Sequence, residues 1–246
     1  MSLLVRLKRT HPTEAPTGKQ APLVLISPHL DDAVFSCSQV LLAHPGTTVI
    51  SVFAGRPPDG RWSEWDEKCF LPGQDPMTVL REEDRQALQC LGATPVHLPF
   101  LDVEYGTTYE IEEIADAIAA QLDALGPESV LIPLGIQHLD HVTTHRAVVR
   151  LIRERPQIRW IIYEELPYRL EYAEYRQTQV RELLEGGFRL SELALPRNLS
   201  TRPKLRAIHK YESQCKAMGR KRIRLALLDE RYWEVSVVGD TEAVGP

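Results

Sequence analysis

Cysteine is scarce in this chain. Only Cys37, Cys69, Cys90 and Cys215 occur among 246 residues, and no two of them form a CxxC pair. Small secreted proteins that depend on disulfides carry a much higher density of cysteine. The spacing therefore argues against a disulfide framework and predicts reduced thiols in a cytoplasmic protein.

Long apolar runs and an excess of positive charge are missing as well. No apolar run approaches the roughly 20 residues of a membrane-spanning helix, and residues 1–20 lack the apolar core of a signal peptide. The chain has 29 basic and 34 acidic residues, for a net charge of -5, whereas nucleic-acid-binding proteins usually carry a basic surplus. We therefore expect no membrane span and no nucleic-acid partner.

The composition otherwise fits one globular domain. Hydrophobic residues make up 43% of the chain and charged residues 26%, which are ordinary values. α/β folds of this length often form a single unit. The polar, proline-containing residues 1–20 predict a flexible N-terminal arm, and residues 21–246 a single domain. The sequence leaves open whether this domain forms a homo-oligomer.

Short runs rich in valine, isoleucine and leucine alternate with segments of helical periodicity. Strands joined by helices pair in parallel through right-handed crossovers. The sequence thus predicts a Rossmann-like, three-layer α/β sandwich with a mostly parallel sheet and a catalytic site at the carboxyl ends of the strands. The expected strands are 22–28, 47–55, 94–100, 129–134, 158–166, 188–195 and an edge strand at 232–239, and the expected helices are 31–43, 78–92, 109–126, 141–155, 168–185 and 204–216.

The stretch LVLISPHLDDAVFSC, residues 23–37, puts polar side chains directly after a buried strand. His29, Asp31 and Asp32 would be costly there unless a metal, a substrate or a helix terminus pairs with them. In parallel sheets, ligands gather beyond the carboxyl ends of the strands. These three residues are therefore candidates for a functional site.

The segment LIPLGIQHLDHVTTHRAV repeats the arrangement, with His138, Asp140, His141 and His145 after another buried strand. Both clusters follow strands at the same expected edge of one sheet, so they are predicted to converge on one cleft. Imidazole and carboxylate together suit Zn²⁺ or another divalent first-row metal.

Each cluster also has a simpler interpretation. Asp31 or Asp32 could cap the following helix, and His138 and His141 could be exposed loop residues. His141 and His145 are four residues apart, which is the spacing of a helical metal-binding pair. The coincidence of two clusters favours a metal site, but the spacing leaves open which three residues bind the metal.

The segments SPHLDDAVFSC and QHLDHVTTHRAV together resemble the two signatures of the LmbE/PIG-L superfamily of metal-dependent N-deacetylases. The resemblance covers roughly residues 22–216. Leu30 and Leu139 stand where proline is commonest in that family, and neither position is a metal ligand in the family pattern.

The resemblance implies a role for each polar residue of the two motifs. Three ligands leave a position for a water, whose pKa zinc lowers, and a nearby carboxylate can take its proton. A protonated imidazole stabilises the developing oxyanion, and a carboxylate two residues away can keep it protonated. The implied assignments are His29, Asp32 and His141 as Zn²⁺ ligands, Asp31 as general base, His138 at the oxyanion, and Asp140 as the residue that orients His138.

Weaker signals indicate substrate contacts. Arg81 starts a helix that resembles the family's arginine-led helix, although a solvated helix residue explains it equally well. Asp102 follows the third strand to the same edge, and Glu165 closes the fifth strand. Tyr211 and Gln214 are expected on a helix surface.

Residues 56–76 form a segment without periodicity that is longer than ordinary connections. We expect it to cover the mouth of the cleft as a loop. Its rings at Trp62, Trp65 and Phe70 could stack on a sugar face, although packing beneath the loop is the simpler alternative.

The family resemblance implies a hydrolase that removes an acyl group, usually acetyl, from an amide nitrogen. The substrate would be an N-acetylglucosamine-type conjugate or a related N-acylated small molecule. Some members of the family act in specialised biosynthesis, and this protein could as well. A metal-dependent phosphoesterase is the rival enzyme, but it usually needs a second metal and more ligands than the two motifs offer. A non-catalytic binding module on the same fold is the third hypothesis. Loss of Asp31 or His138 would favour it, but the sequence contains both residues.

Overall fold

The computed structural model describes residues 23–193 and 201–238, so the arm expected at 1–20 lies outside the described residues. The strands are β1 Leu23–Ser27, β2 Thr48–Ser51, β3 Thr94–His97, β4 Ser129–Pro133, β5 Arg159–Tyr163, β6 Phe188–Leu193 and β7 Tyr232–Val237. The helices are α1 Asp32–Ala43, α2 Glu64–Cys69, α3 Pro76–Cys90, the 3-10 turn η1 Val103–Tyr105, α4 Ile111–Leu125, α5 Leu139–Glu154, α6 Tyr168–Glu171, α7 Ala173–Glu185, α8 Thr201–Ile208 and α9 Glu212–Ala226.

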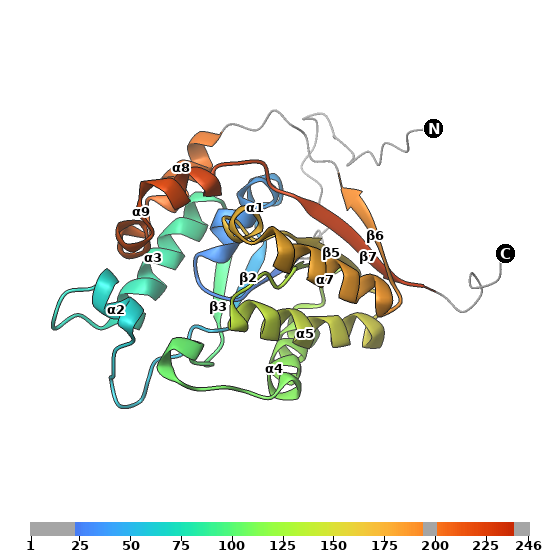
Figure 1. The fold of residues 1–246 in the computed structure, drawn as a ribbon, viewed down its shortest axis with the longest axis horizontal. Coiled ribbons are helices and arrows are strands. Elements are labelled where there is room, and N and C mark those ends of the chain that lie inside the picture. Colours follow the sequence, from blue (N-terminus) through green and yellow to red (C-terminus); the bar gives the residue numbers. More distant parts are fainter. Residues whose placement is uncertain (1–22, 194–200, 239–246) are drawn as a thin grey trace.

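The strands form one seven-stranded sheet in the order β3-β2-β1-β4-β5-β7-β6 (Figure 1). The five strands from β3 to β5 are parallel, and β7 runs antiparallel to both of its neighbours. From β1 the chain moves outward to β2 and β3, then returns to place β4 on the other side of β1. Such a reversal of strand order opens a crevice at the carboxyl ends, where ligands of α/β proteins bind.

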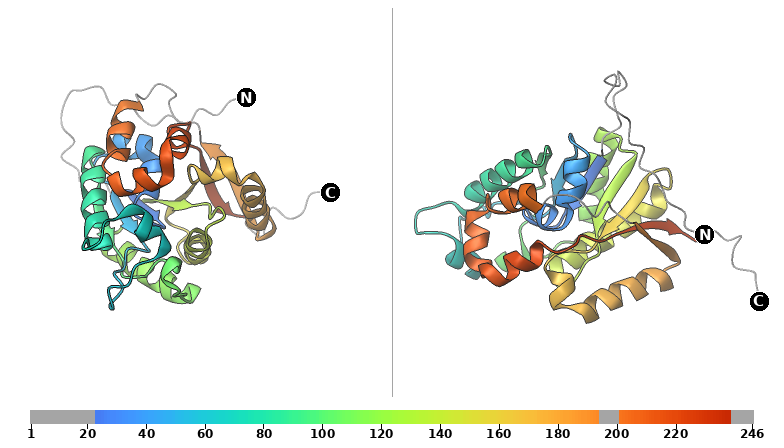
Figure 2. Two further views of the ribbon diagram at one scale, coloured as in Figure 1. Left: turned by 60° about the vertical axis from the view of Figure 1, so that its left-hand side comes forward. Right: turned by 90° about the horizontal axis from the view of Figure 1, so that it is seen from above.

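Helices cover both faces of the sheet, as the two views of Figure 2 show. Because side chains alternate along a strand, Val24 and Ile26 of β1 join the core beneath α4, α5 and α7, whereas Leu25 between them joins the core beneath α1, α3 and α8. This alternation confirms the predicted three-layer α/β sandwich. None of the described helices is long and apolar enough to span a membrane.

Four details differ from the expectation. The strand expected at the edge, β7, lies inside the sheet because β6 pairs along its outer side. The expected helix 204–216 is two helices, α8 and α9, and the expected helix 168–185 is divided at Tyr172 into α6 and α7. The segment 56–76 contains α2, which Ser63 and Asp66 start through a reciprocal capping box. Six residues are too few for a helical period to be visible.

Candidate active site

The turn between β1 and α1 brings His29 and Asp32 together. Ser27 fastens this turn, because its hydroxyl donates to the His29 carbonyl at 2.6 Å and accepts from the Ala33 amide at 3.1 Å. The His29 amide in turn donates to Asp32 Oδ2 at 2.9 Å. Side chains at both ends of the turn therefore fix the position of the first motif.

The turn between β4 and α5 depends on a glycine. Gly135 has a φ of +84°, and a Cβ at this position would lie 2.7 Å from Cβ of His145. His138 caps α5 by accepting the Asp140 amide on Nδ1 at 3.3 Å, and His141 follows within the first turn of the helix. His145 is turned away, since its Nδ1 lies 2.9 Å from the Pro133 carbonyl.

Three donor atoms from the two motifs form a nearly equilateral triangle. His29 Nδ1 lies 3.2 Å from Asp32 Oδ2, and His141 Nε2 lies 3.1 Å from that oxygen and 3.2 Å from His29 Nδ1. Tetrahedral zinc with bonds of about 2.0–2.1 Å keeps its ligand atoms about 3.3 Å apart. The spacing of His29, Asp32 and His141 therefore fits one cation bound by all three.

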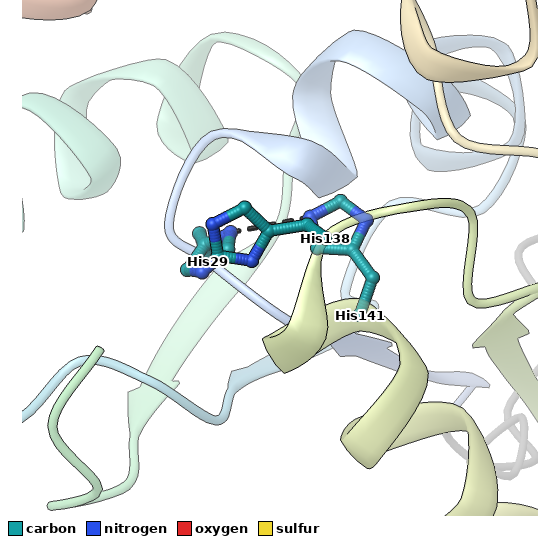
Figure 3. A group of neighbouring side chains, drawn as sticks. All are labelled: His29, His138 and His141. Carbon is teal, nitrogen blue, oxygen red and sulfur yellow. Dashed lines mark hydrogen bonds between the residues drawn. The ribbon is translucent and has the colours of Figure 1, made fainter. Parts of the chain in front are cut away.

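The described residues also contain two overlapping groups whose donor atoms lie within 4.8 Å of one another: His29 with His138 and His141, and His29 with Asp102, His138 and Asp140. Figure 3 shows the rings of His29, His138 and His141 gathered between the β1–α1 turn and the start of α5. The triangle with Asp32 has mutual distances of 3.1–3.2 Å and combines both imidazoles with one carboxylate.

The charges at this triangle stabilise one another. Burial disfavours the Asp32 carboxylate, but the charge and hydrogen bond of His141 outweigh it and hold the pKa of Asp32 well below its usual range. Burial likewise opposes protonation of His141, yet Asp32 and Glu165 raise its pKa to about 9. A cation that binds here takes the place of imidazole protons, so metal binding is coupled to proton release.

Glu165 lies behind His141 and does not line the cavity described below. It is fully buried, and its Oε1 faces His141 Nδ1 at 3.3 Å. The same carboxylate accepts the backbone amides of Leu134, Gly135 and Ile136 at 3.2, 2.7 and 3.1 Å. Its geometry is that of a residue that orients a metal ligand, whereas the sequence suggested a substrate contact.

Asp140 contacts a different histidine from the one expected. Its Oδ2 lies 3.1 Å from His29 Nε2 but 4.0 Å from His138 Nδ1, and it also accepts the Val103 amide at 3.1 Å. Asp102 Oδ2 approaches the same His29 nitrogen at 3.3 Å. Both carboxylates thus face His29 on the side opposite its Nδ1.

His138 lies at the cavity wall as a neutral imidazole. Burial, followed by the charges of His29 and His141, lowers the pKa of His138 to about 3. Because its Nδ1 accepts the Asp140 amide, the proton of the neutral ring is assigned to Nε2. The ring is therefore a hydrogen-bond donor without a positive charge.

Asp31 also lines the cavity, next to the triangle. Burial, followed by the charge of Asp32, raises the pKa of Asp31 to about 7. A bound dication would lower this pKa again. The two adjacent aspartates are thus held in different electrostatic states, one firmly ionised and one poised to exchange a proton.

A cavity of 280 Å³ opens beside these residues. Trp65 and Asp66 of α2 line it together with Tyr168, and Asp102 lies near His29. Part of the segment 56–76 therefore borders the cavity, through the short helix α2 and the preceding Ser63.

Two other predicted substrate contacts lie outside the lining. Trp62 packs edge-on against Phe70, with ring centroids 6.5 Å apart. The Arg81 guanidinium donates to the Ala54 carbonyl at 3.1 and 2.6 Å, which ties α3 to the chain after β2.

The expectation for Tyr211 and Gln214 is wrong, because both are buried. Gln214 lines the cavity and accepts a hydrogen bond from Trp65 Nε1 at 2.8 Å. Tyr211 donates to the Leu30 carbonyl at 2.7 Å. Tyr211 follows the buried Ala207 and Ile208 by four and three residues, which is the spacing of one helix face, so helical periodicity could have indicated its burial.

The family described as GlcNAc-PI de-N-acetylase (PIG-L) matches residues 24–152, more than half of the chain. This span includes both motifs. No curated protein sequence matches the chain.

Several solved structures share the fold. The A40926 pseudoaglycone deacetylase Dbv21 is 28% identical with a TM-score of 0.73, over 89% of this chain and 98% of that one. A triple mutant of a deacetylase of the teicoplanin biosynthetic pathway, Orf2*T, is 26% identical with a TM-score of 0.68, over 89% and 99%. The zinc-inhibited form of teicoplanin deacetylase Orf2, at 24% identity and a TM-score of 0.71 over 89% and 99%, shows likeness of fold alone.

Proposed function

The chain belongs to the PIG-L family of GlcNAc-PI de-N-acetylases, and from that membership we propose that it is a metal-dependent N-deacetylase acting on an N-acetylglucosamine-type or related N-acylated small molecule. One observation carries the proposal. Three donor atoms with mutual distances of 3.1–3.2 Å stand beside a carboxylate with a pKa of about 7, at the wall of a cavity.

We propose His29, Asp32 and His141 as the ligands of a zinc ion. Two imidazole nitrogens and one carboxylate oxygen form the donor set of many hydrolytic zinc sites. Bound there, zinc would supply a Lewis acid for the amide carbonyl and acidify a water. Glu165 and Asp140 would orient the two histidine rings from the side away from the metal.

Asp31 would act as the general base. Its carboxylate takes a proton from the attacking water, and the same carboxyl group then returns a proton to the amine that leaves. A group that performs both steps works best with a pKa near the operating pH. Burial raises the pKa of Asp31 to about 7 in the metal-free protein, and this starting value offsets part of the lowering that a bound dication would cause.

His138 would stabilise the oxygen of the tetrahedral intermediate as a neutral donor through Nε2–H. A preorganised donor at a developing oxyanion lowers the barrier without itself carrying a charge. Here the proposal differs from the family expectation of a protonated ring, because the pKa of His138 is lowered and Asp140 points at His29.

The substrate is proposed to be a small molecule that bears an N-acylated amino sugar. Dbv21 is described as a deacetylase of the A40926 pseudoaglycone, and a conjugate of that kind, made in specialised biosynthesis, is the substrate class we favour. Trp65 and Asp102 line the cavity and could meet sugar C–H surfaces and hydroxyls. A cytoplasmic location and the oligomeric state stay predictions.

A phosphoesterase is less well supported. It would hold two metal ions about 3.5–4 Å apart. The second group of donors in the described part of the chain again requires His29, which the first group already uses. One bound equivalent of metal per chain therefore separates the two functions.

The decisive experiment incubates the purified, zinc-loaded protein with a panel of N-acetylated amino sugars and glycopeptide pseudoaglycones, and measures released acetate. We expect acetate from at least one member and one metal equivalent per chain by elemental analysis. Both should be lost in His29→Ala and His141→Ala. Full metal content in both variants would contradict the ligand set.

A further inference from the structure

The turn that carries Asp31 has a hydrogen-bond donor for every backbone carbonyl from residue 27 to 31. Buried carbonyls in a turn need such partners. Four of the five are served by the turn itself or by the chain next to it. These bonds run from Val52 N to Ser27 O at 2.9 Å, from Phe53 N to Pro28 O at 2.9 Å, from Ser27 Oγ to His29 O at 2.6 Å and from Phe35 N to Asp31 O at 3.0 Å.

The fifth carbonyl, that of Leu30, is held from a distant part of the chain. Tyr211, between α8 and α9, is 0% exposed, and its hydroxyl donates to the Leu30 oxygen at 2.7 Å. This oxygen belongs to the planar peptide unit that ends at Cα of Asp31. Because the unit rotates as one body, a fixed oxygen also fixes the point from which the Asp31 side chain extends.

A second contact explains how the Tyr211 hydroxyl is kept in place. It lies 2.7 Å from Oδ1 of Asp84, which is fully buried on α3, and Oδ2 of Asp84 lies 2.7 Å from His97 Nε2. A phenol has only one proton to donate. When it donates to Leu30, the facing oxygen of Asp84 has to carry a proton of its own. Burial raises the pKa of Asp84 and so favours that form.

We propose that Tyr211 is a positioning residue for Asp31: its hydroxyl holds the Leu30–Asp31 peptide in the orientation that presents the Asp31 carboxylate to the attacking water. This inference rests on the proposed function, in which Asp31 is the base. Asp84 supports the hydroxyl from behind, and the half-buried His97 connects Asp84 to the protein surface.

The chain contains a closely matched control. Tyr232 is 1% exposed and belongs to the same core cluster as Tyr211. Its hydroxyl also contacts one backbone carbonyl, Ser36 O at 3.2 Å, and one carboxylate, Glu230 Oε2 at 2.6 Å. Ser36 lies inside α1, so the Tyr232 hydroxyl stabilises the core without touching the peptide of the base.

The test compares Tyr211→Phe with Tyr232→Phe in the zinc-loaded full chain, below the melting temperature of each. We expect kcat to fall in Tyr211→Phe by about 10- to 100-fold, the scale of a misplacement of the order of 1 Å. Its KM and its metal content should stay at the wild-type values. Tyr232→Phe should keep the wild-type kcat even where its melting temperature falls equally.

Three outcomes overturn the proposal: an unchanged kcat in Tyr211→Phe, a change confined to KM, or an equal loss of kcat in Tyr232→Phe. If Tyr211→Phe does not fold, Asp84→Ala replaces it. Without the carboxyl group behind it, the Tyr211 hydroxyl is expected to lose its fixed position against Leu30 and kcat to fall, and an unchanged kcat would count against the inference. A wild type inactive on every substrate defeats the proposed function itself, whereas an active wild type with an equally active Tyr211→Phe defeats only this inference.

Discussion

Asp31 and Asp32 are neighbours in the chain but have opposite electrostatic environments. Asp32 faces two imidazoles at 3.1 and 3.2 Å, whereas Asp31 faces the cavity beside a second negative charge. We predict that Asp31→Asn keeps its metal and loses about 10²- to 10⁴-fold in kcat, the usual scale for a general base. Asp32→Asn should instead lose metal affinity. Near-normal turnover by Asp31→Asn would refute the base assignment.

Glu165 and Glu164 are also adjacent in the chain and have different partners, so their variants can be compared in the same way. Glu165 faces His141, while Glu164 accepts hydrogen bonds from Arg176 and Trp233. Removing a residue that orients a metal ligand costs about 10- to 100-fold in metal affinity. We predict this loss for Glu165→Gln and none for Glu164→Gln, measured by competition with a chromogenic chelator. Equal affinities in the two variants would show that Glu165 does not orient His141.

Residue types and their positions at strand ends were enough to predict that the two motifs meet at one edge of the sheet, and the family resemblance singled out His29, Asp32 and His141 within them. They could not predict the partners of Asp140 and Glu165. Those partners depend on ring rotation and on which backbone amides come within reach, and both are set by packing between distant segments. The burial of Tyr211, by contrast, follows helical spacing from the buried Ala207 and Ile208 and could have been predicted.

Among the elements, the short helix α2 contributes Trp65 and Asp66 to the cavity wall. Its Asp66 accepts a hydrogen bond from the Tyr105 hydroxyl at 2.7 Å, and Trp65 is bonded to Gln214 of α9. Two segments therefore hold this short helix at the wall of the cavity. The sequence suggested a loop here, whereas the structure has a helix fixed by hydrogen bonds.

We predict that Trp65→Ala raises KM with little change in kcat, because it removes binding that is uniform along the reaction. Metal content should not change. Trp62→Ala serves as the control, since Trp62 packs on Phe70 and does not line the cavity. Should the two variants have the same KM, the indole of Trp65 is not part of substrate recognition.

Long periodic elements were predictable, and short or interrupted ones were not. The pattern of α4 and the apolar runs of β1 and β4 identified each correctly in type and approximate position. α9 was missed as a separate helix, and it is itself interrupted at Gly219, whose φ of +73° departs from helical geometry. The amino-acid composition on both sides of such a break is typical of a helix, so the break could not be predicted from composition.

At the scale of the whole molecule, the change of strand order between β1 and β4 determines where the site lies. The alternation of strands and helices predicted the parallel sheet, and the polar residues after two strands predicted the shared edge. The pairing of β7 between β5 and β6 could not be predicted, because a strand's sequence specifies its two faces and not its neighbours.

Glu164 joins three parts of the fold at this end of the sheet. It accepts from Arg176 of α7 at 2.7 Å and from Trp233 of β7 at 2.8 Å, and it closes β5. Burial opposes its ionisation, but these hydrogen bonds outweigh burial and lower the pKa of Glu164. A lowered pKa stabilises the fold above the pKa of the unfolded state, and this contribution is lost as the pH falls through the folded value.

We therefore predict that Glu164→Gln lowers the melting temperature at pH 7 and has a smaller effect as the solution is acidified. Glu154→Gln, which breaks an exposed pair with Arg150, should change the melting temperature little at either pH. The measurement is a set of thermal melts of the wild type and the two variants, at pH 7 and at an acidic pH. A Glu164→Gln effect that is independent of pH would contradict the ionised state assigned to Glu164.

The cavity lining has a consequence for the end of the catalytic cycle. Five carboxylates line it, from Asp31, Asp32, Asp66, Asp102 and Glu104, against the single guanidinium of Arg222 among the described lining residues. The substrate amide is neutral, but the amine left by deacylation becomes an ammonium ion near neutral pH. Even with a dication bound, these carboxylates leave a surplus of negative charge, so we expect the site to attract its product more strongly than its substrate and escape of the amine to limit turnover. Added salt screens such attraction, so moderate ionic strength should relieve inhibition by the free amino sugar while leaving the first turnover unchanged.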